Sequence, residues 1–149
     1  MISIHTQTFT PQNKLSDPQK HHLVDLLHVH LQEFGDSKEQ IACAIDYALQ
    51  NYKSFGGFIT VLYANNIPIG AVVVNRTGMK GYIPENILVY IAVHANHRGQ
   101  GFGKLLMQNA IDNAVGDIAL HVEPHNPARH LYEKMGLTNK YLEMRLKKQ

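Results

Sequence analysis

Apolar residues recur along this 149-residue chain with two different periods, and the two periods predict strands and helices in alternation. Apolar runs or alternation, both typical of strands, occur in six short segments: 2–9, 57–64, 67–75, 87–93, 118–122 and 141–146. Asn65 and Asn66 separate the second segment from the third, and asparagine tolerates the positive φ angles of a two-residue hairpin turn. The pattern therefore predicts six strands, two of them joined as a hairpin.

Two helices are expected between the first and second strands. Ser16 or Asp17 can cap the first helix, and its apolar face consists of Leu23, Leu26, Leu27, Leu31 and Phe34. Ser37 and Gln40 have the spacing of a capping box for the second helix, which should run to about residue 51. Its core side consists of Ile41, Ala44, Ile45, Ala48 and Leu49.

Two more helices are expected in the second half of the chain. The helix over 102–115 should bury a stripe made of Leu105, Leu106, Ala110, Ile111, Ala114 and Val115, with Gly116 as its C′ residue. A shorter helix over 127–135 has Asn126 as its cap. The predicted order is β-α-α-β-β-β-α-β-α-β, which defines an α/β (α+β) fold, and the length predicts a single domain over 1–149.

Composition excludes several classes of function. The formal net charge of +2 is too small to indicate nucleic-acid binding, and no apolar run reaches the length of a membrane span. The single cysteine, Cys43, cannot form an internal disulfide and lies in an apolar patch, which favours a small buried residue. We therefore expect a cytoplasmic protein. Ten histidines are present, but their spacing does not indicate a metal site.

A glycine-rich turn between the strand 87–93 and the helix 102–115 carries the main functional signal. It consists of Arg98, Gly99, Gln100, Gly101, Phe102 and Gly103, followed by Lys104. Glycine permits the turn dihedrals and has no Cβ to keep an anion away. The helix that follows contributes unpaired N–H groups and its positive dipole end. The turn is therefore predicted to bind phosphate, and the diphosphate of a nucleotide-like cofactor is the natural occupant.

The spacing of this turn distinguishes it from two common phosphate sites. A P-loop requires G-x-x-x-x-G-K-[ST], whereas position 98 is Arg and Lys104 is followed by Leu105. The dinucleotide fingerprint G-x-G-x-x-G, begun at Gly99, would need a glycine where Lys104 stands. ATP binding would further need magnesium ligands, for which the sequence offers no candidates.

The remaining pattern, R-x-x-G-x-G between a strand and a helix, resembles the acyl-coenzyme A signature of the GNAT N-acetyltransferase superfamily. A second segment, residues 126–137, resembles the family's N-x-x-A-x-x-x-Y-x-x-x-G-[FL] motif. The resemblance covers roughly residues 57–136. It implies a central mixed β-sheet with helices on both faces and acetyl-CoA as cosubstrate, without a metal. One departure is the short C-terminus, since the family usually has a two-strand hairpin after the glycine that matches Gly136.

The resemblance also implies roles for individual residues. The cofactor would lie along Ile91, Ala92 and Val93, with the Val93 N–H facing the thioester oxygen, although a plain core strand would have the same residues. Its diphosphate would bind the glycine-rich turn, and Asn126 would contact it as well. Tyr132 matches the tyrosine that reaches the thioester sulfur; at a pKa of about 10 it stays protonated at neutral pH and can donate a proton.

A general base is less well defined by the sequence. Ile87 stands where some family members carry a catalytic glutamate, and His121 occupies the position of a carboxylate in others. An imidazole suits this role near neutral pH, but a histidine hydrogen-bonded within the sheet is an equal interpretation. Glu85, Tyr90 and His94 are weaker candidates.

The predicted activity is acetyl transfer to an unidentified primary amine by direct attack, through a tetrahedral intermediate, in a monomer or homodimer. The missing glutamate favours a small-molecule amine or a protein α-amine. The alternative is a non-catalytic acyl-CoA-binding sensor or regulatory domain.

Overall fold

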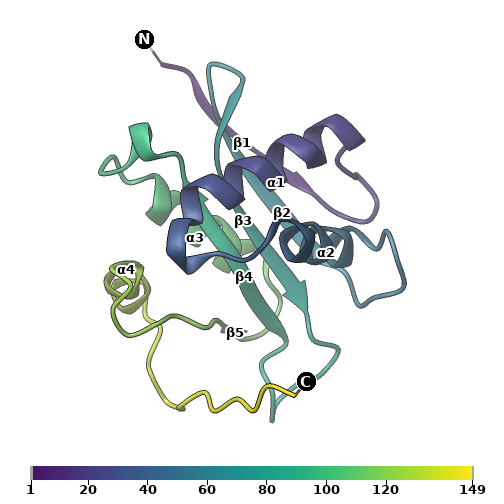
Figure 1. Ribbon diagram of the computed structural model, residues 1–149, viewed down its shortest axis with the longest axis vertical. Coiled ribbons are helices and arrows are strands. Elements are labelled where there is room, and N and C mark those ends of the chain that lie inside the picture. The colour runs from purple at the N-terminus through teal and green to yellow at the C-terminus, as the bar shows by residue number, and fades with distance from the viewer. Residues whose placement is uncertain (1, 149) are drawn as a thin grey trace.

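A five-stranded mixed sheet forms the centre of the protein, seen in a computed structural model that describes residues 2–148 (Figure 1). The strands are β1 (Ile4–Phe9), β2 (Gly57–Ala64), β3 (Ile67–Arg76), β4 (Asn86–Val93) and β5 (Ile118–Ala119). The helices are α1 (Asp17–Leu31), α2 (Lys38–Leu49), α3 (Phe102–Asn113) and α4 (Ala128–Lys134), with 3₁₀ turns η1 (Gln32–Phe34) and η2 (Ala95–His97).

Strands β1 to β4 form an antiparallel meander in chain order, and β5 is parallel to β4 at the end of the sheet. The pairing of β4 with β5 covers only two positions, Asn86 with Ile118 and Ile87 with Ala119. Strand β4 also contains a bulge at Val89, where its register with β3 shifts by one residue. The sheet is therefore continuous up to β4 and only briefly joined beyond it.

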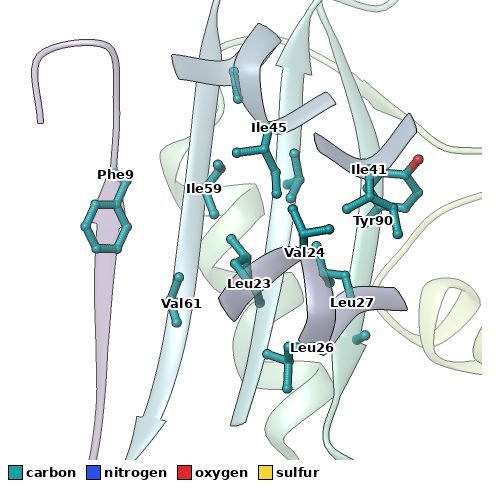
Figure 2. Packing of buried hydrophobic residues seen from close by; sticks show 14 of the residues in the cluster. Phe9, Leu23, Val24, Leu26, Leu27, Ile41, Ile45, Ile59, Val61 and Tyr90 are labelled. Atoms are coloured by element: carbon teal, nitrogen blue, oxygen red, sulfur yellow. The ribbon is translucent and has the colours of Figure 1, made fainter. Parts of the chain in front are cut away.

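Helices cover both faces of this sheet and create two hydrophobic cores. On one face, α1 and α2 pack residues such as Leu27 and Ile45 against Ile59 and Val61 (Figure 2). On the other face, α3 and α4 pack against a second set of strand residues, with Leu106 fully buried. This arrangement confirms the predicted mixed sheet with helices on both faces.

Most of the local signals in the sequence form as expected. Ser16 caps α1, its hydroxyl accepts from the Gln19 N–H at 3.2 Å, and the Gln19 side chain completes the capping box. Ser37 caps α2, with its hydroxyl accepting from the Gln40 N–H at 3.3 Å, but among the described residues the Gln40 side chain makes no return bond, so only half of the predicted capping box forms. Asn65 and Asn66 have φ angles of 51° and 67°, so the predicted hairpin turn between β2 and β3 is confirmed.

The last predicted strand is wrong. Residues 138–148 form an extended coil without strand pairing, and Leu142, Met144 and Leu146 are 84–90% exposed. Figure 1 shows this segment as a yellow trace without an arrow. Alternation of apolar and polar residues favours a strand only where a neighbouring strand supplies hydrogen bonds, and within residues 2–148 no strand pairs with this segment. The predicted strand over 118–122 is likewise shorter, ending at Ala119.

Two predictions of burial are also wrong. In α3 the buried residues are Leu106, Met107 and Ala110, whereas Leu105 is 41% exposed and Val115 is 85% exposed. For Val115 the cause is an earlier helix end, because α3 stops at Asn113 with Ala114 as its C-cap; Leu105 lies within the helix, on the side next to the buried Leu106 that faces solvent. Cys43 is exposed, since it points away from the face of α2 that contacts the sheet.

Candidate active site

The glycine-rich turn between η2 and α3 is the centre of the site. Gly99 and Gly101 have φ angles of 76° and 84°, a left-handed conformation that glycine adopts without strain. A Cβ built at either position would meet no atom within 4 Å, so the turn opens to solvent. Gly101 is the N-cap of α3 and lacks a side chain that could satisfy the first amides of the helix.

The backbone amides of residues 99–104 are unoccupied by other protein groups. The first helical bond of α3 is donated by Leu105 to the Gly101 carbonyl at 3.1 Å, and no hydrogen bond within residues 2–148 is donated by the six amides before it. Unpaired amides at the positive end of a helix are an arrangement that suits an anion. Gly103 allows close packing here, because a Cβ at this position would lie 3.2 Å from Leu131 of α4.

Beside this turn, β4 and β5 separate. The His94 N–H donates to Ile69 of β3 at 2.6 Å, which directs the amide toward β3. Because successive amides of a strand point to opposite edges, the Val93 N–H faces away from β3, toward the gap beyond the short β5. The Val93 carbonyl accepts from the Arg98 Nε at 3.3 Å, in agreement with this direction. A free strand edge therefore leads to the glycine turn.

Tyr132 of α4 lies in the core on the α3 side of the sheet, with 8% of its surface exposed. Burial raises the pKa of its hydroxyl to about 12. The hydroxyl is therefore protonated at neutral pH and retains the capacity to donate a hydrogen bond.

His121 and Asn126 lie in the loop between β5 and α4. His121 is exposed, and no hydrogen bond to it occurs in the described part of the chain. The N-cap of α4 is Pro127 rather than the predicted Asn126, but the Asn126 Oδ1 accepts from the Ala128 N–H at 2.9 Å and so satisfies the first amide of the helix.

Arg98 has a role that the sequence did not reveal. Besides its bond to Val93, its Nη2 donates to the His30 carbonyl at the end of α1 at 2.7 Å. The guanidinium thus joins α1, β4 and the glycine turn, while its charge remains next to the anion site.

A second polar contact that was not predicted lies on the opposite face. The Tyr90 hydroxyl donates to the Asp36 carboxylate at 2.5 Å, which fixes the loop between α1 and α2 on β4. Burial, followed by the contact with Asp36, raises the pKa of Tyr90, which argues against a role as general base. In the same region Phe34 contacts His125, with ring centroids 5.3 Å apart, so this loop touches the loop after β5.

Two surface cavities lie elsewhere. One, of about 410 Å³, is lined by α1 and α2 residues such as Lys20 and Asp25; the other, of about 170 Å³, lies near Gln50 and Arg76. Neither includes residues 98–104. An open turn beside a strand edge fits a long, flexible ligand better than a small one that needs enclosure. Within residues 2–148 no cluster of metal-binding side chains and no helix able to cross a membrane is found.

A mixed sheet that opens next to a glycine-rich anion site defines the GNAT class of fold. The family profile described as the acetyltransferase (GNAT) family matches residues 21–137. The chain belongs to this family, which makes it an acyltransferase of the acetyl-CoA-dependent kind.

Solved structures agree in fold. The chain is similar to a ribosomal-protein-alanine N-acetyltransferase from Brucella melitensis (18% identity, 97% of this chain and 99% of that one covered, TM-score 0.64). It is also similar to the aminoglycoside N-acetyltransferase AAC(6')-Iy in complex with CoA (13% identity, 99% of this chain and 96% of that one covered, TM-score 0.72). A third similar chain belongs to the NatC complex bound to Gag peptide and CoA (25% identity, 90% of this chain and 84% of that one covered, TM-score 0.68).

Proposed function

We propose that this protein transfers the acetyl group of acetyl-CoA to a primary amine, and that its 149 residues act as one domain. The observation that carries this proposal is the set of unoccupied amides at residues 99–104, in a chain of the GNAT family. Six N–H groups at the start of a helix provide hydrogen bonds for a diphosphate, and two left-handed glycines leave the space it needs.

The contacts of the cosubstrate follow from this placement. Its diphosphate would bind the turn formed by Arg98, Gly99, Gln100, Gly101, Phe102, Gly103 and Lys104. Its pantetheine arm would lie along the free edge of β4 at Ile91, Ala92 and Val93, as an added strand does. Asn126 would contact it from the opposite side of the gap. No metal is needed by this arrangement.

Bound acetyl-CoA supplies an activated acetyl group, which passes to the amine as a C–N bond forms and the C–S bond breaks. The Val93 N–H would stabilise the negative charge that develops on the carbonyl oxygen. Tyr132 would donate its proton to the departing thiolate, since burial keeps the hydroxyl protonated. His121, exposed beside the gap, would accept the proton that the amine loses.

The acceptor class can be narrowed by the basicity of amines. A lysine side chain with a pKa of about 10.4 requires about 4–5 kcal/mol to be neutral at pH 7, whereas an α-amine requires only about 1 kcal/mol. A single exposed imidazole is a weak base, so an α-amine or a small amine of low pKa is favoured. The similar structures include proteins named for both kinds of acceptor, ribosomal-protein alanine and aminoglycosides.

The proposed phosphate-binding turn at residues 99–104, called the cradle from here on, is tested by a matched pair of glycine variants. Gly99 and Gly81 have φ angles of 76° and 77°, and neither has a neighbour within 4 Å of a Cβ. Alanine at either position costs a similar strain of about 1–2 kcal/mol. We expect Gly99→Ala to weaken CoA binding about tenfold or more in calorimetry, because its methyl group enters the anion site. Gly81→Ala should bind as the wild type does; equal affinity for all three proteins would contradict the cradle.

Catalysis is tested separately by the release of CoA thiol. Acetyl-CoA is offered with peptides of free α-amine, lysine peptides with a blocked N-terminus, aminoglycosides and polyamines. We expect release with α-amines or small amines, and less with lysine side chains. CoA binding without thiol release from any amine would favour the non-catalytic sensor.

A further inference from the structure

The last turn of α1 is fastened to the turn that leads into the glycine cradle, and His30 forms most of this junction. Its ring Nδ1 accepts a hydrogen bond from the Ala95 N–H in η2 at 3.2 Å. Its carbonyl accepts from Arg98 at 2.7 Å. Its ring also packs on the His94 ring, with centroids 4.1 Å apart. His30 therefore binds the start of η2 through Ala95 and the residue after it through Arg98, and it packs on the ring of His94, which precedes η2.

His94 continues the same structure toward the cradle. Its Nδ1 accepts from the Asn96 N–H at 3.1 Å, which caps η2. Its ring lies 5.9 Å from that of His97, and the His97 ring lies 6.4 Å from Phe102, the first residue of α3. The row of rings runs from α1 to the helix whose amides form the anion site.

We propose that His30 is a positioning residue for the cofactor cradle, and that the junction it forms with η2 holds only while the imidazoles of His30 and His94 are neutral. This inference rests on the proposed binding of CoA at residues 99–104. It assigns His30 no contact with the cofactor or the acceptor.

The hydrogen bonds require neutral rings. An Nδ1 that accepts a hydrogen bond carries no proton, so each ring must hold its single proton on Nε2. A second proton turns Nδ1 into a donor that faces the N–H of Ala95 or Asn96, and the contact becomes repulsive. Protonation of His30 would therefore detach η2 from α1, and protonation of His94 would remove the cap of η2.

The charges around His30 also favour its neutral form. The groups that face it from η2 and the cradle are His94 and Arg98; the Arg98 guanidinium repels an added proton, as does the His94 ring once it is charged, and His97 lies behind His94. No carboxylate forms an ion pair with these three histidines in the part of the chain that the structure covers. Burial first, and then these neighbours, lower the pKa of His30 below its usual 6.5.

The direction in which CoA affinity changes with pH distinguishes a positioning role of His30 from electrostatic attraction between charged histidines and the phosphates. A lowered pKa means that the junction is intact above about pH 6.5 and is lost as the pH falls through the pKa of the folded protein. Cofactor affinity should then decrease on acidification. If the histidines acted only as positive charges near the phosphates, affinity would increase instead.

The experiment compares His30→Asn, His30→Ala and His22→Asn. Asparagine Oδ1 takes nearly the place of Nδ1 and accepts a hydrogen bond, but it does not titrate. His22 is an exposed histidine of the same helix and serves as the control. CoA affinity is measured by calorimetry at about pH 7.5 and about pH 5.5, on either side of the usual histidine pKa. The hydrogen-exchange protection of the Ala95 amide is measured without CoA at both pH values.

We expect wild-type affinity to weaken about tenfold between the two pH values, the equivalent of one lost hydrogen bond. His30→Asn should match the wild type at the higher pH and lose most of this dependence. His30→Ala should bind weakly at both, and His22→Asn should behave as the wild type. Ala95 protection should follow the same order.

Two results would overturn the inference. One is wild-type affinity that is unchanged or tighter at the lower pH, and the other is a full pH dependence in His30→Asn. If no protein binds CoA at either pH, the proposed function fails. The protection of Ala95 in the unliganded proteins then still decides whether a neutral His30 holds η2.

Discussion

At the scale of the residue, burial determines what the Tyr132 hydroxyl can do. In water a tyrosine ionises near pH 10, whereas the surroundings of Tyr132 raise its pKa to about 12. The neutral form is thus favoured in the folded protein. The hydroxyl therefore stays protonated over the whole pH range in which α-amines lose their proton. A protonated Tyr132 and a neutral amine can thus be present at the same pH.

Replacing Tyr132 by phenylalanine tests this role. The variant removes one oxygen and keeps the ring in the core, so the fold and the cradle should persist. We expect kcat to fall about 10²-fold or more, a usual contribution for general acid catalysis, with CoA affinity within about twofold of the wild type. Steady-state kinetics and calorimetry provide the two values.

The matched control is Tyr63→Phe, which removes a hydroxyl from a half-buried tyrosine on β2, far from the cradle in the sheet order. Unchanged turnover in both variants would mean that the thiolate takes its proton from another donor.

Single residues also show how far a sequence can be interpreted. Gly99 and Gly101 were identifiable because only glycine combines a left-handed turn with an open approach. The contact of Tyr90 with Asp36 was not, since these residues are 54 positions apart and meet only when α1 and α2 cover the sheet. The same holds for His30, whose role depends on residues 65 and 68 positions away.

At the scale of the element, one buried polar side chain holds β5 in place. Asn86 at the start of β4 is 2% exposed, and its Nδ2 donates to the carbonyls of Val115 and Asp117 at 2.9 and 3.2 Å. Its backbone N–H also donates to Asp117. These bonds fasten the segment between α3 and β5 to the sheet at the only place where β4 and β5 pair.

We expect Asn86→Ala to lower the free energy of unfolding by about 1–3 kcal/mol, because it removes both hydrogen bonds of a buried side chain, while the bond from the backbone N–H to Asp117 remains. Chemical denaturation measures this value. Asn51→Ala, which removes an exposed amide bonded to Asp46, should cost less than about 0.5 kcal/mol. A similar small cost at both positions would show that β5 is held by its apolar contacts.

Element prediction from the sequence succeeded where the signal was local. The caps at Ser16 and Ser37 and the turn at Asn65 and Asn66 depend on neighbours within a few residues, and all formed. The strand predicted over 141–146 failed because a strand depends on a distant partner, which no local pattern specifies.

At the scale of the whole molecule, the C-terminal segment contributes little to the fold. Its large apolar side chains at Tyr141, Leu142, Met144 and Leu146 are 79–90% exposed. We expect removal of residues 138–149 to change the free energy of unfolding by less than about 1 kcal/mol, because little apolar area leaves the core. Thermal and chemical denaturation of the shortened chain measure this.

Leu106→Ala provides the comparison. Because Leu106 is fully buried, this substitution should lower the free energy of unfolding by about 2–5 kcal/mol. A loss of that size in the shortened chain would mean that the segment pairs with a sheet edge in solution.

Strand β5 pairs with β4 at two positions, whereas β1 to β4 pair along most of their length, and this difference affects the order in which the chain folds. Strands β2 to β4 follow one another through short connections and can pair soon after they form, whereas β5 reaches its neighbour only through the crossover that includes α3. The meander should therefore consolidate early and the β5 side late. A newly made chain would acquire a stable framework before it acquires the capacity to hold its cosubstrate, and ligand present at that moment would favour completion of the final steps.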